Sequence, residues 1–227
     1  MYPTKPLKNE ADLIERCKRI EVWTYGQLAA SLRVPIPATP VQRKGWAGQA
    51  IELALGSTAG SRAVPDFYEL GIELKTLPVN HLGKPAESTF VTTISLLSIH
   101  KEVWSTSQCR TKLNRVLWIP IEGDPQIPFP TRRIGHGILW SPTMAEETVL
   151  QQDWSELTLL ISTGRVAEIN ASLGQYLQVR PKAANGKSLC QALDEQGNKV
   201  QTLPRGFYLR ASFTESLLNP RKRNEET

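Results

Sequence analysis

The sequence predicts a mixed α/β fold in which a sheet is flanked by helices. The stretch "NRVLWIPIEG" is a nearly continuous apolar run, which is typical of a central strand covered on both faces. The stretch "SPTMAEETVLQQDWSELTLLISTG" has Leu150, Trp154, Leu157 and Ile161 at helical spacing, so it predicts the longest helix. The stretch "IELKTL" alternates apolar and charged residues, as a strand does. With 227 residues, the chain can bury one large core or form two small lobes.

Helices are predicted for most of the first 56 residues. One runs over Glu10 to Ile20 and places Leu13, Cys17 and Ile20 on one face. A second begins at "TYGQ", where Thr24 and Gln27 have the spacing of a capping box, and "VPIPATP" then forms a loop. A third follows in "KGWAGQAIELALG" and ends at Gly56; its residues at core spacing are Trp46, Ala50, Leu53 and Ala54.

The last third of the chain mixes strands with helices. Ser141 is expected to cap the long helix, with Pro142 in its first turn. After it we expect a strand in "YLQVR", a helix in "GKSLCQALDEQ", and strands in "KVQTL" and "GFYLRA". The charged tail from about residue 219 to residue 227 is expected to fray.

Composition restricts the class of protein. No apolar run reaches the roughly 18 residues of a membrane span, and the amino-terminal stretch is too polar for a secretory signal. Cys17, Cys109 and Cys190 form no CxxC pair, so we expect reduced thiols in a cytoplasmic protein without a zinc site. A formal charge of +5 and an isoelectric point near 9.2 favour a polyanionic partner, although many enzymes are equally basic.

The stretch "PDFYELGIELK" carries candidate catalytic residues. Glu73 and Lys75 share one face of the predicted strand, and a turn at Gly71 can bring Asp66 close to Glu73. Two carboxylates in one place need a proton or a cation between them, and an all-oxygen site suits Mg²⁺. In a site of this kind, a metal ion activates water and offsets phosphate charge while a lysine orients the nucleophile. On the pattern alone, a solvated, charged hairpin is the commoner explanation.

Three other features bear on this choice. Glu52 lies in the apolar stretch "AIELAL", so it is a candidate third acid, or else a helix-edge carboxylate that reaches solvent. The sequence lacks a GxxxxGK[ST] loop and a GxSxG motif, and its histidines (His81, His100 and His136) are scattered. Any catalysis is therefore expected to use carboxylates and a metal.

Two carboxy-terminal strands are candidates for a DNA-reading surface. On "YLQVRPKAAN", alternation places Tyr176, Gln178 and Arg180 on one face. The residues expected to protrude from this and the neighbouring strand are Arg180, Lys182, Arg205, Tyr208 and Arg210. Arginine can pair bidentately with guanine and lysine can neutralise phosphate, but an outward sheet face with solubilising charge has the same pattern. Lys44 before Gly45 at a helix start, together with Lys112 and Arg115, are further candidate phosphate contacts or ordinary surface cations.

The motifs together resemble the MutH family of mismatch-repair endonucleases. The resemblance runs from "TYGQLAA" to "FYLRASFT". It is carried by "KGWAGQAIELALG", "AGSRAVPDFYELGIELKT", "STFV", "VLWIPIEG", "YLQVRPKAAN" and "LPRGFYL", in that order. It implies a restriction-endonuclease-like fold, with residues 1–227 forming one domain of two lobes around a DNA cleft. Ser105, Gln108 and Thr111 stand where relatives are expected to have acidic or histidine residues.

The resemblance also implies roles for individual residues. Asp66, Glu73 and Lys75 would be the catalytic triplet, Glu52 an additional acid, and the carbonyl of Leu74 a metal ligand. Implied DNA contacts are Lys44, Gly45, Phe90, Lys112, Arg180, Pro181, Lys182 and Tyr208.

The implied activity is Mg²⁺-dependent nicking of the unmethylated strand, 5′ of the G in hemimethylated GATC sites, with Mn²⁺ tolerated. MutL, loaded by MutS at a mismatch, would stimulate a monomeric enzyme that acts in the bacterial cytoplasm, at the nucleoid, and not at a membrane. Two alternatives remain: a stand-alone GATC-specific restriction-type endonuclease, and a catalytically silent DNA-binding module.

Overall fold

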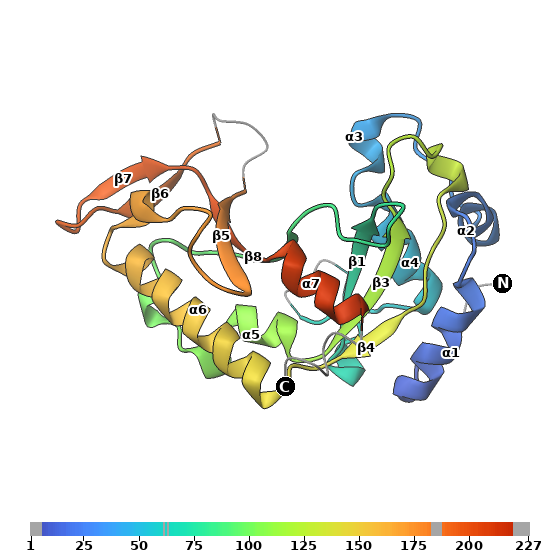
Figure 1. Cartoon of the computed structure of the whole chain (residues 1–227), viewed down its shortest axis with the longest axis horizontal. Coiled ribbons are helices and arrows are strands. Elements are labelled where there is room, and N and C mark those ends of the chain that lie inside the picture. Colours follow the sequence, from blue (N-terminus) through green and yellow to red (C-terminus); the bar gives the residue numbers. More distant parts are fainter. Residues whose placement is uncertain (1–5, 61, 63, 183–187, 220–227) are drawn as a thin grey trace. The chain divides into compact units, whose positions relative to one another are not determined.

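The computed structural model describes residues 6–60, 62, 64–182 and 188–219. The chain divides into two compact units (Figure 1). The first unit is made of Met1–Ala86 and Asn114–Ser141, and the second of Glu87–Leu113 and Pro142–Thr227. The predicted tail at about 219–227 lies outside the described residues, except for Asn219.

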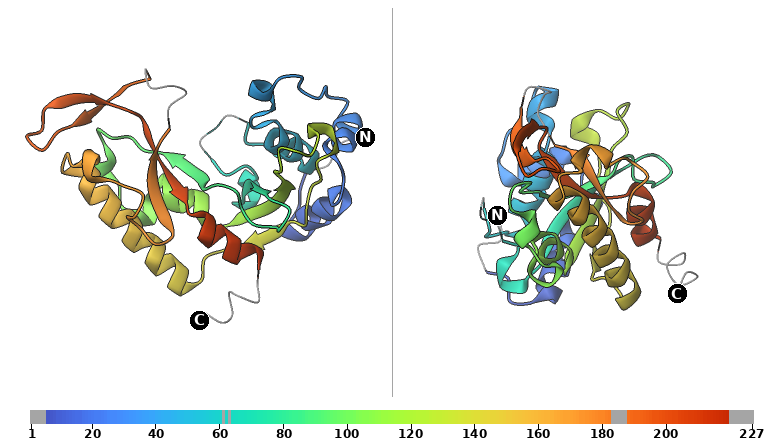
Figure 2. Two further views of the ribbon diagram at one scale, coloured as in Figure 1. Left: turned by 45° about the horizontal axis from the view of Figure 1, so that its top comes forward. Right: turned by 90° about the vertical axis from the view of Figure 1, so that its left-hand side faces the viewer.

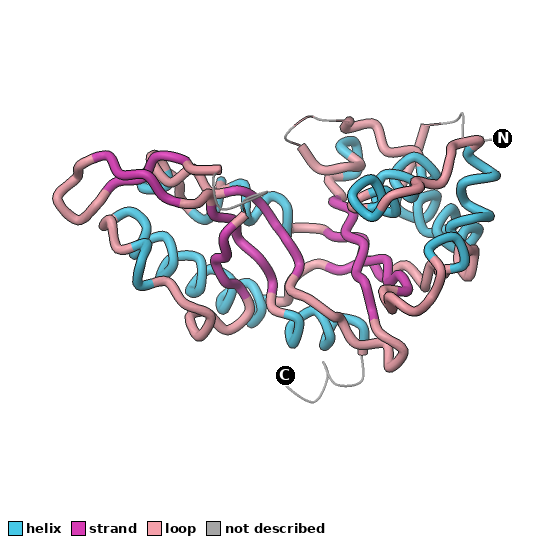
Figure 3. The backbone as a smooth tube through the Cα atoms, turned by 90° about the horizontal axis from the view of Figure 1, so that it is seen from above, coloured by secondary structure: helices cyan, strands magenta, loops and turns pink. Residues whose placement is uncertain are grey.

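A three-stranded sheet forms the centre of the first unit. Its order is β1 (Glu73–Val79), β3 (Val116–Glu122) and β4 (Ile138–Trp140), and β1 runs parallel to β3. Figure 3 draws the strands of the chain in magenta among helices in cyan. Val116, Leu117, Trp118 and Ile119 are all buried, which confirms that the apolar run is a central strand. Glu73 lies opposite Val116 at the start of the parallel pair, so this pairing fixes the beginning of β1.

Helices pack beside this sheet within the first unit. They are α1 (Glu10–Ile20), α2 (Tyr25–Leu32), α3 (Pro40–Arg43) and α4 (Trp46–Leu55). The predicted bounds of α1 and the Thr24–Gln27 capping box of α2 are confirmed, whereas the four-residue α3 was not foreseen. The core prediction for Leu53 is wrong: its side chain is 52% exposed, because α4 buries Ala47, Ile51 and Leu55 instead.

A second three-stranded sheet forms the centre of the second unit. Its order is β2 (Thr89–Thr93), β8 (Arg205–Leu209) and β5 (Leu177–Pro181), and both pairings are antiparallel. The same unit contains a hairpin of β6 (Cys190–Leu193) and β7 (Lys199–Thr202), and Figure 2 shows this hairpin from two further directions.

The hairpin corrects one sequence prediction. The stretch "GKSLCQALDEQ" was expected to be a helix, but Cys190–Leu193 is a strand. The carboxylate of Asp194 accepts hydrogen bonds from the backbone N–H groups of Gln196 and Asn198, which stabilises a tight turn. Four residues are too few for apolar spacing to distinguish a helix from a strand, and pairing with β7 decides the outcome.

The helices of the second unit are α5 (Gln108–Leu113), α6 (Met144–Ser162) and α7 (Ala211–Leu218). The four predicted core residues of α6 are buried, but its predicted cap is wrong. Thr143 caps the helix in a capping box with Glu146, while the Ser141 hydroxyl donates to the carbonyl of Asn114. The capping box satisfies two amide groups at once, which favours a start at Met144.

Both units combine helices with a central sheet, so the predicted mixed α/β class is confirmed and is consistent with a restriction-endonuclease-like fold. The single two-lobed domain and its cleft stay predictions. In the described part of the chain, no helix is both long and apolar enough to cross a membrane. The three cysteines are unpaired, as predicted.

Candidate active site and nucleic-acid interface

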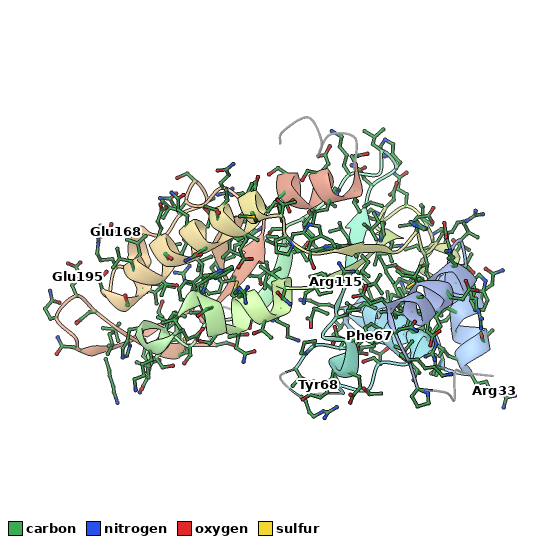
Figure 4. All side chains as sticks on the ribbon, turned by 90° about the horizontal axis from the view of Figure 1, so that it is seen from below. Arg33, Phe67, Tyr68, Arg115, Glu168 and Glu195 are labelled. Atoms are coloured by element: carbon green, nitrogen blue, oxygen red, sulfur yellow. The ribbon has the colours of Figure 1, made fainter. Side chains whose placement is uncertain are left out.

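A short loop brings Asp66 back to the first residues of β1. Phe67 and Ile72 exchange two backbone hydrogen bonds of 2.9 and 3.2 Å, which close the loop around η1 (Tyr68–Leu70). Gly71 makes the return possible because its φ of +66° lies in the left-handed region. Phe67 is buried, whereas Tyr68 is half exposed (Figure 4). The burial of Phe67 anchors Asp66, the residue before it.

The carboxylate of Asp66 lies against the backbone of β1. Its Oδ2 accepts a 2.8 Å hydrogen bond from the N–H of Leu74, and its own carbonyl accepts a 2.7 Å bond from the Ser57 hydroxyl. Ser57 is tied to α4 in turn, since its N–H donates to the carbonyl of Glu52. Asp66 is therefore held from two sides, by the strand and by the turn after α4.

Glu73 and Lys75 form a close ion pair on one face of β1. Lys75 Nζ lies 2.8 Å from Glu73 Oε1, and the two side chains are 15% and 4% exposed. The N–H of Glu73 donates to the carbonyl of Arg115, just before β3, whereas Leu74 is buried in the core on the opposite side of the strand. The structure thus brings Asp66, Glu73 and Lys75 to the same end of β1, as the alternation predicts.

The donor set fits a hard cation. Asp66 and Glu73 supply carboxylate oxygens beside the Leu74 peptide, and Mg²⁺ binds through one or two carboxylates together with water and substrate oxygens. Within the described ranges, no three His, Cys, Asp or Glu side chains group in a way that could hold a metal ion. Glu52, half-buried on α4, therefore does not complete a three-acid cluster, and its role as a ligand stays a prediction.

The amino-terminal end of α4 is exposed and well anchored. Lys44 and Gly45 are exposed, and Gly45 has a φ of +79° at the cap position, where no side chain caps the helix. Trp46, the first helical residue, packs edge-on against Tyr25 and Phe129, with ring centroids 5.8 and 5.6 Å away. The aromatic contacts fix a helix start whose amide groups suit a phosphate.

The second unit gathers aromatic and cationic side chains on one face of its sheet. The rings of Phe90 and Tyr208 meet edge to face at 5.3 Å. Lys182 Nζ lies 2.9 Å from the centre of the Phe90 ring, and the Arg180 guanidinium lies 6.0 Å from that of Tyr208. Burial raises the pKa of the Tyr208 hydroxyl, the charge of Arg180 opposes this shift and that of Glu87 adds to it, so the phenol stays protonated at neutral pH. We call Phe90, Arg180, Lys182 and Tyr208 the aromatic-cation face.

One of the residues predicted to protrude has another role. Arg210 precedes α7 and donates to the carbonyls of Ala171, Leu173 and Gly174, so its guanidinium holds a loop together. The prediction for Arg210 counted alternation without the neighbouring loop that its guanidinium contacts. Gln178, predicted to share a face with Arg180, is buried at 8% exposure and pairs with Tyr208 on β8.

Arg115, the remaining candidate cation of the first unit, pairs with Glu10 at 2.6 Å, and the other predicted contacts lie in the second unit. Pro181 ends β5 and is exposed, whereas Lys112 is half-buried on α5 and Arg205 half-buried on β8. The departures at Ser105, Gln108 and Thr111 are all exposed.

Comparison with known proteins identifies the family. The profile described as "DNA mismatch repair enzyme MutH" matches residues 55–153, which include Asp66, Glu73 and Lys75. A protein of Serratia proteamaculans named "DNA mismatch repair protein MutH" is 50% identical over 213 residues, covering 94% of this chain and 93% of the relative. Relatives of the same name from Histophilus somni and Vibrio campbellii are 47% and 45% identical, over 96% and 93% of this chain and 98% and 93% of their own lengths. The chain belongs to the MutH family.

MutH membership makes the chain part of a family of DNA mismatch repair enzymes, as the sequence motifs indicate. The structure adds residues that the motifs did not single out for the MutH site. Ser57 holds Asp66, and Ser88 accepts a hydrogen bond from Arg180. Both are loop or strand-edge serines without a distinctive spacing, so only the tertiary structure reveals them.

Proposed function

We propose that this MutH-family chain is a Mg²⁺-dependent endonuclease that nicks the unmethylated strand of hemimethylated GATC sites. The observation that carries the proposal is the placement of Asp66, Glu73 and Lys75 at one end of β1, with the Leu74 N–H 2.8 Å from Asp66 Oδ2. A solvated hairpin would leave these charges in water, whereas here Glu73 is 3% exposed beside Lys75. Charged groups are rarely buried together without a function or a strong structural reason.

The residues divide the work of phosphodiester hydrolysis. Asp66, Glu73 and the carbonyl of Leu74 would hold Mg²⁺, which when bound supplies positive charge at the scissile phosphate and lowers the pKa of water. Lys75 keeps a cation at the same place and can orient the attacking water through hydrogen bonds. Glu73, paired at 2.8 Å, positions the Lys75 ammonium group.

The cationic residues outside this cluster would bind the duplex. Lys44 and the amide groups of α4 can take a phosphate, and Lys112 can contribute a second contact along the backbone. Arg180 can pair with a guanine edge in the major groove, with Lys182 and Pro181 beside it. The stretch Asp66–Lys75 would cut, and the aromatic-cation face would read the sequence.

Methylation sensing follows from the same face. Adenine N6 donates hydrogen bonds in the major groove, and a methyl group removes one donor and adds bulk. Tyr208 is the candidate that rejects this methyl group, because its ring lies on the face and its hydroxyl oxygen can accept a hydrogen bond from an unmethylated N6. The test compares Tyr208→Phe with Tyr208→Ala. If Tyr208→Phe still discriminates fully between methylated and unmethylated adenine, and only Tyr208→Ala loses binding, packing rather than the hydroxyl is responsible.

The nicking assay tests the main proposal. Duplexes with one unmethylated, hemimethylated or fully methylated GATC site are incubated with Mg²⁺, with and without MutL. We expect nicking of the unmethylated strand, stimulation by MutL, and a loss of at least about 10³-fold in Glu73→Ala. Glu69→Ala is the matched control, since Glu69 is an exposed acid of the same loop. Cleavage of fully methylated sites, or equal nicking by Glu73→Ala, would refute the proposal.

The same assay separates the alternatives. A stand-alone restriction-type endonuclease would cut both strands of a GATC site without MutL. A silent DNA-binding module would bind the duplexes without nicking them. Sedimentation of the free protein tests the proposed monomer, and we propose that it acts on the nucleoid in the bacterial cytoplasm.

A further inference from the structure

Gly206 lies under the two rings of the aromatic-cation face. On β8 it precedes Tyr208 by two residues, so both point to the same side of the sheet, and it pairs with Arg180 on β5 and with Thr93 on β2. A β-bulge between Phe90 and Thr92 shifts the register of β2 at this point. The bulge re-aims the strand, and Phe90 turns toward Gly206.

A side chain at position 206 would crowd both rings and the backbone of β2. A Cβ atom there would lie 2.9 Å from Cε2 of Phe90, 3.0 Å from the carbonyl oxygen of Thr92 and 3.3 Å from Cε2 of Tyr208. To admit this atom, the Phe90 ring has to shift, and the carbonyl of Thr92 and the Tyr208 ring have to give way slightly. The φ of Gly206 is not in the left-handed region, so glycine is needed for space and not for conformation.

Ser88 fixes the other side of the face. Its hydroxyl oxygen accepts a hydrogen bond of 2.5 Å from Nη1 of Arg180, a residue 92 positions away in the sequence. Ser88 lies just before β2, so this bond joins the edge of β2 to the exposed end of β5, on either side of β8. Arg180 is otherwise an exposed arginine with many rotamers, and ordering such a side chain costs entropy at the moment of binding.

We propose that Gly206 and Ser88 are positioning residues for sequence recognition, which rests on the proposed function. Gly206 provides the floor that seats Phe90 and Tyr208, and Ser88 holds the Arg180 guanidinium in one orientation before DNA arrives. Neither residue needs to touch a base. A pre-oriented guanidinium makes its bidentate contact with guanine without first losing rotamer freedom, which favours the correct base over the wrong one.

The experiment measures discrimination and not only affinity. For wild type, Ser88→Ala and Ser88→Thr, kcat/KM for nicking is compared between a GATC duplex and duplexes with one base pair of the site changed. Binding to unrelated duplex DNA is measured in parallel at one salt concentration. We expect Ser88→Ala to lower the GATC preference about fivefold to tenfold. Binding to unrelated DNA should be unchanged, and Ser88→Thr, which keeps the hydroxyl, should retain the preference.

Gly206→Ala supplies the second arm. The added methyl group displaces a ring of the face, so we expect a loss of GATC preference of about tenfold or more. Ser155→Ala is the control for the serine variants, because Ser155 is exposed on α6 and bonds only within that helix. Thermal unfolding reports whether each variant folds. If Gly206→Ala does not fold, the comparison of Ser88→Ala with Ser88→Thr tests the proposal.

The outcomes distinguish two failures. Wild-type protein without a preference for GATC would overturn the proposed function, and this inference with it. Wild type with a preference that Ser88→Ala leaves intact would overturn the inference alone. Equal loss of binding to GATC and unrelated DNA in Ser88→Ala would also overturn it, since that pattern shows a general structural defect.

Discussion

Replacing Glu73 and Lys75 together should abolish activity while leaving the protein folded. Lys75→Met alone removes the ammonium group that lies 2.8 Å from the Glu73 carboxylate, whose side chain is 4% exposed. Breaking a buried pair from one side costs about 3–5 kcal/mol, and the 15% exposure of Lys75 places this case near about 3 kcal/mol. Glu73→Leu leaves the Lys75 ammonium group without this carboxylate, but the ammonium group can still reach water. We therefore expect Glu73→Leu to lower the free energy of unfolding by about 1–2 kcal/mol.

The double variant Glu73→Leu/Lys75→Met should be close to wild type in stability. An apolar pair of similar volume avoids the desolvation of both charges, and such replacements are often neutral or stabilising. The two single costs would then sum to about 4–5 kcal/mol while the double variant costs about 0–1 kcal/mol, a coupling of at least about 3 kcal/mol. Nicking should fall by about 10³-fold or more in all three variants.

Urea unfolding at pH 7 and the nicking assay measure both quantities. Glu168→Ala is the control: Glu168, labelled in Figure 4, pairs with Arg165 at 2.6 Å, but the two side chains are 50% and 45% exposed. It should leave the free energy of unfolding nearly unchanged, because water and salt screen an exposed ion pair. The reasoning would be refuted if the free-energy losses of the two single variants summed to within about 0.5 kcal/mol of the loss in the double variant.

Three further predictions test other parts of the structure. Asp153→Ala should lower the free energy of unfolding by about 3 kcal/mol, because the buried carboxylate accepts three backbone N–H groups at 2.7–2.8 Å; urea unfolding measures it, and a cost below about 1 kcal/mol would contradict it. The hydrogen bond and charge of Arg115 lower the pKa of Glu10. Glu10→Gln should therefore be less stable than wild type above about pH 4.5, and this difference in unfolding free energy should vanish as the pH falls through the lowered pKa. A difference that stays constant across a pH series of unfolding curves would disprove this. Burial raises the pKa of the Cys17 thiol to about 12, so alkylation at pH 8 followed by mass spectrometry should modify half-exposed Cys190 first and Cys17 only after unfolding.

Local patterns predicted much of the fold, because their determinants lie within a few residues of sequence. The bounds of α1 follow from one apolar stripe, and the start of α2 follows from a capping box. The predictions that failed depended on neighbours distant in the sequence. The pairing of β6 with β7 overrode a helical pattern. The guanidinium of Arg210 donates hydrogen bonds to carbonyl groups of a loop that is distant in the sequence.

The sequence by itself determined which residues are candidates for the chemistry. Alternation placed Glu73 and Lys75 on one face of a strand, and Gly71 marked the turn that returns Asp66, since both effects act over fewer than about ten residues. Only the tertiary structure decided that Glu73 is buried and that its N–H donates to the carbonyl of Arg115. It also decided that Ser88 contacts Arg180 and that Gly206 lies against the Phe90 ring. These contacts join residues far apart in the chain, and their energy depends on packing and strand register, which no local pattern encodes.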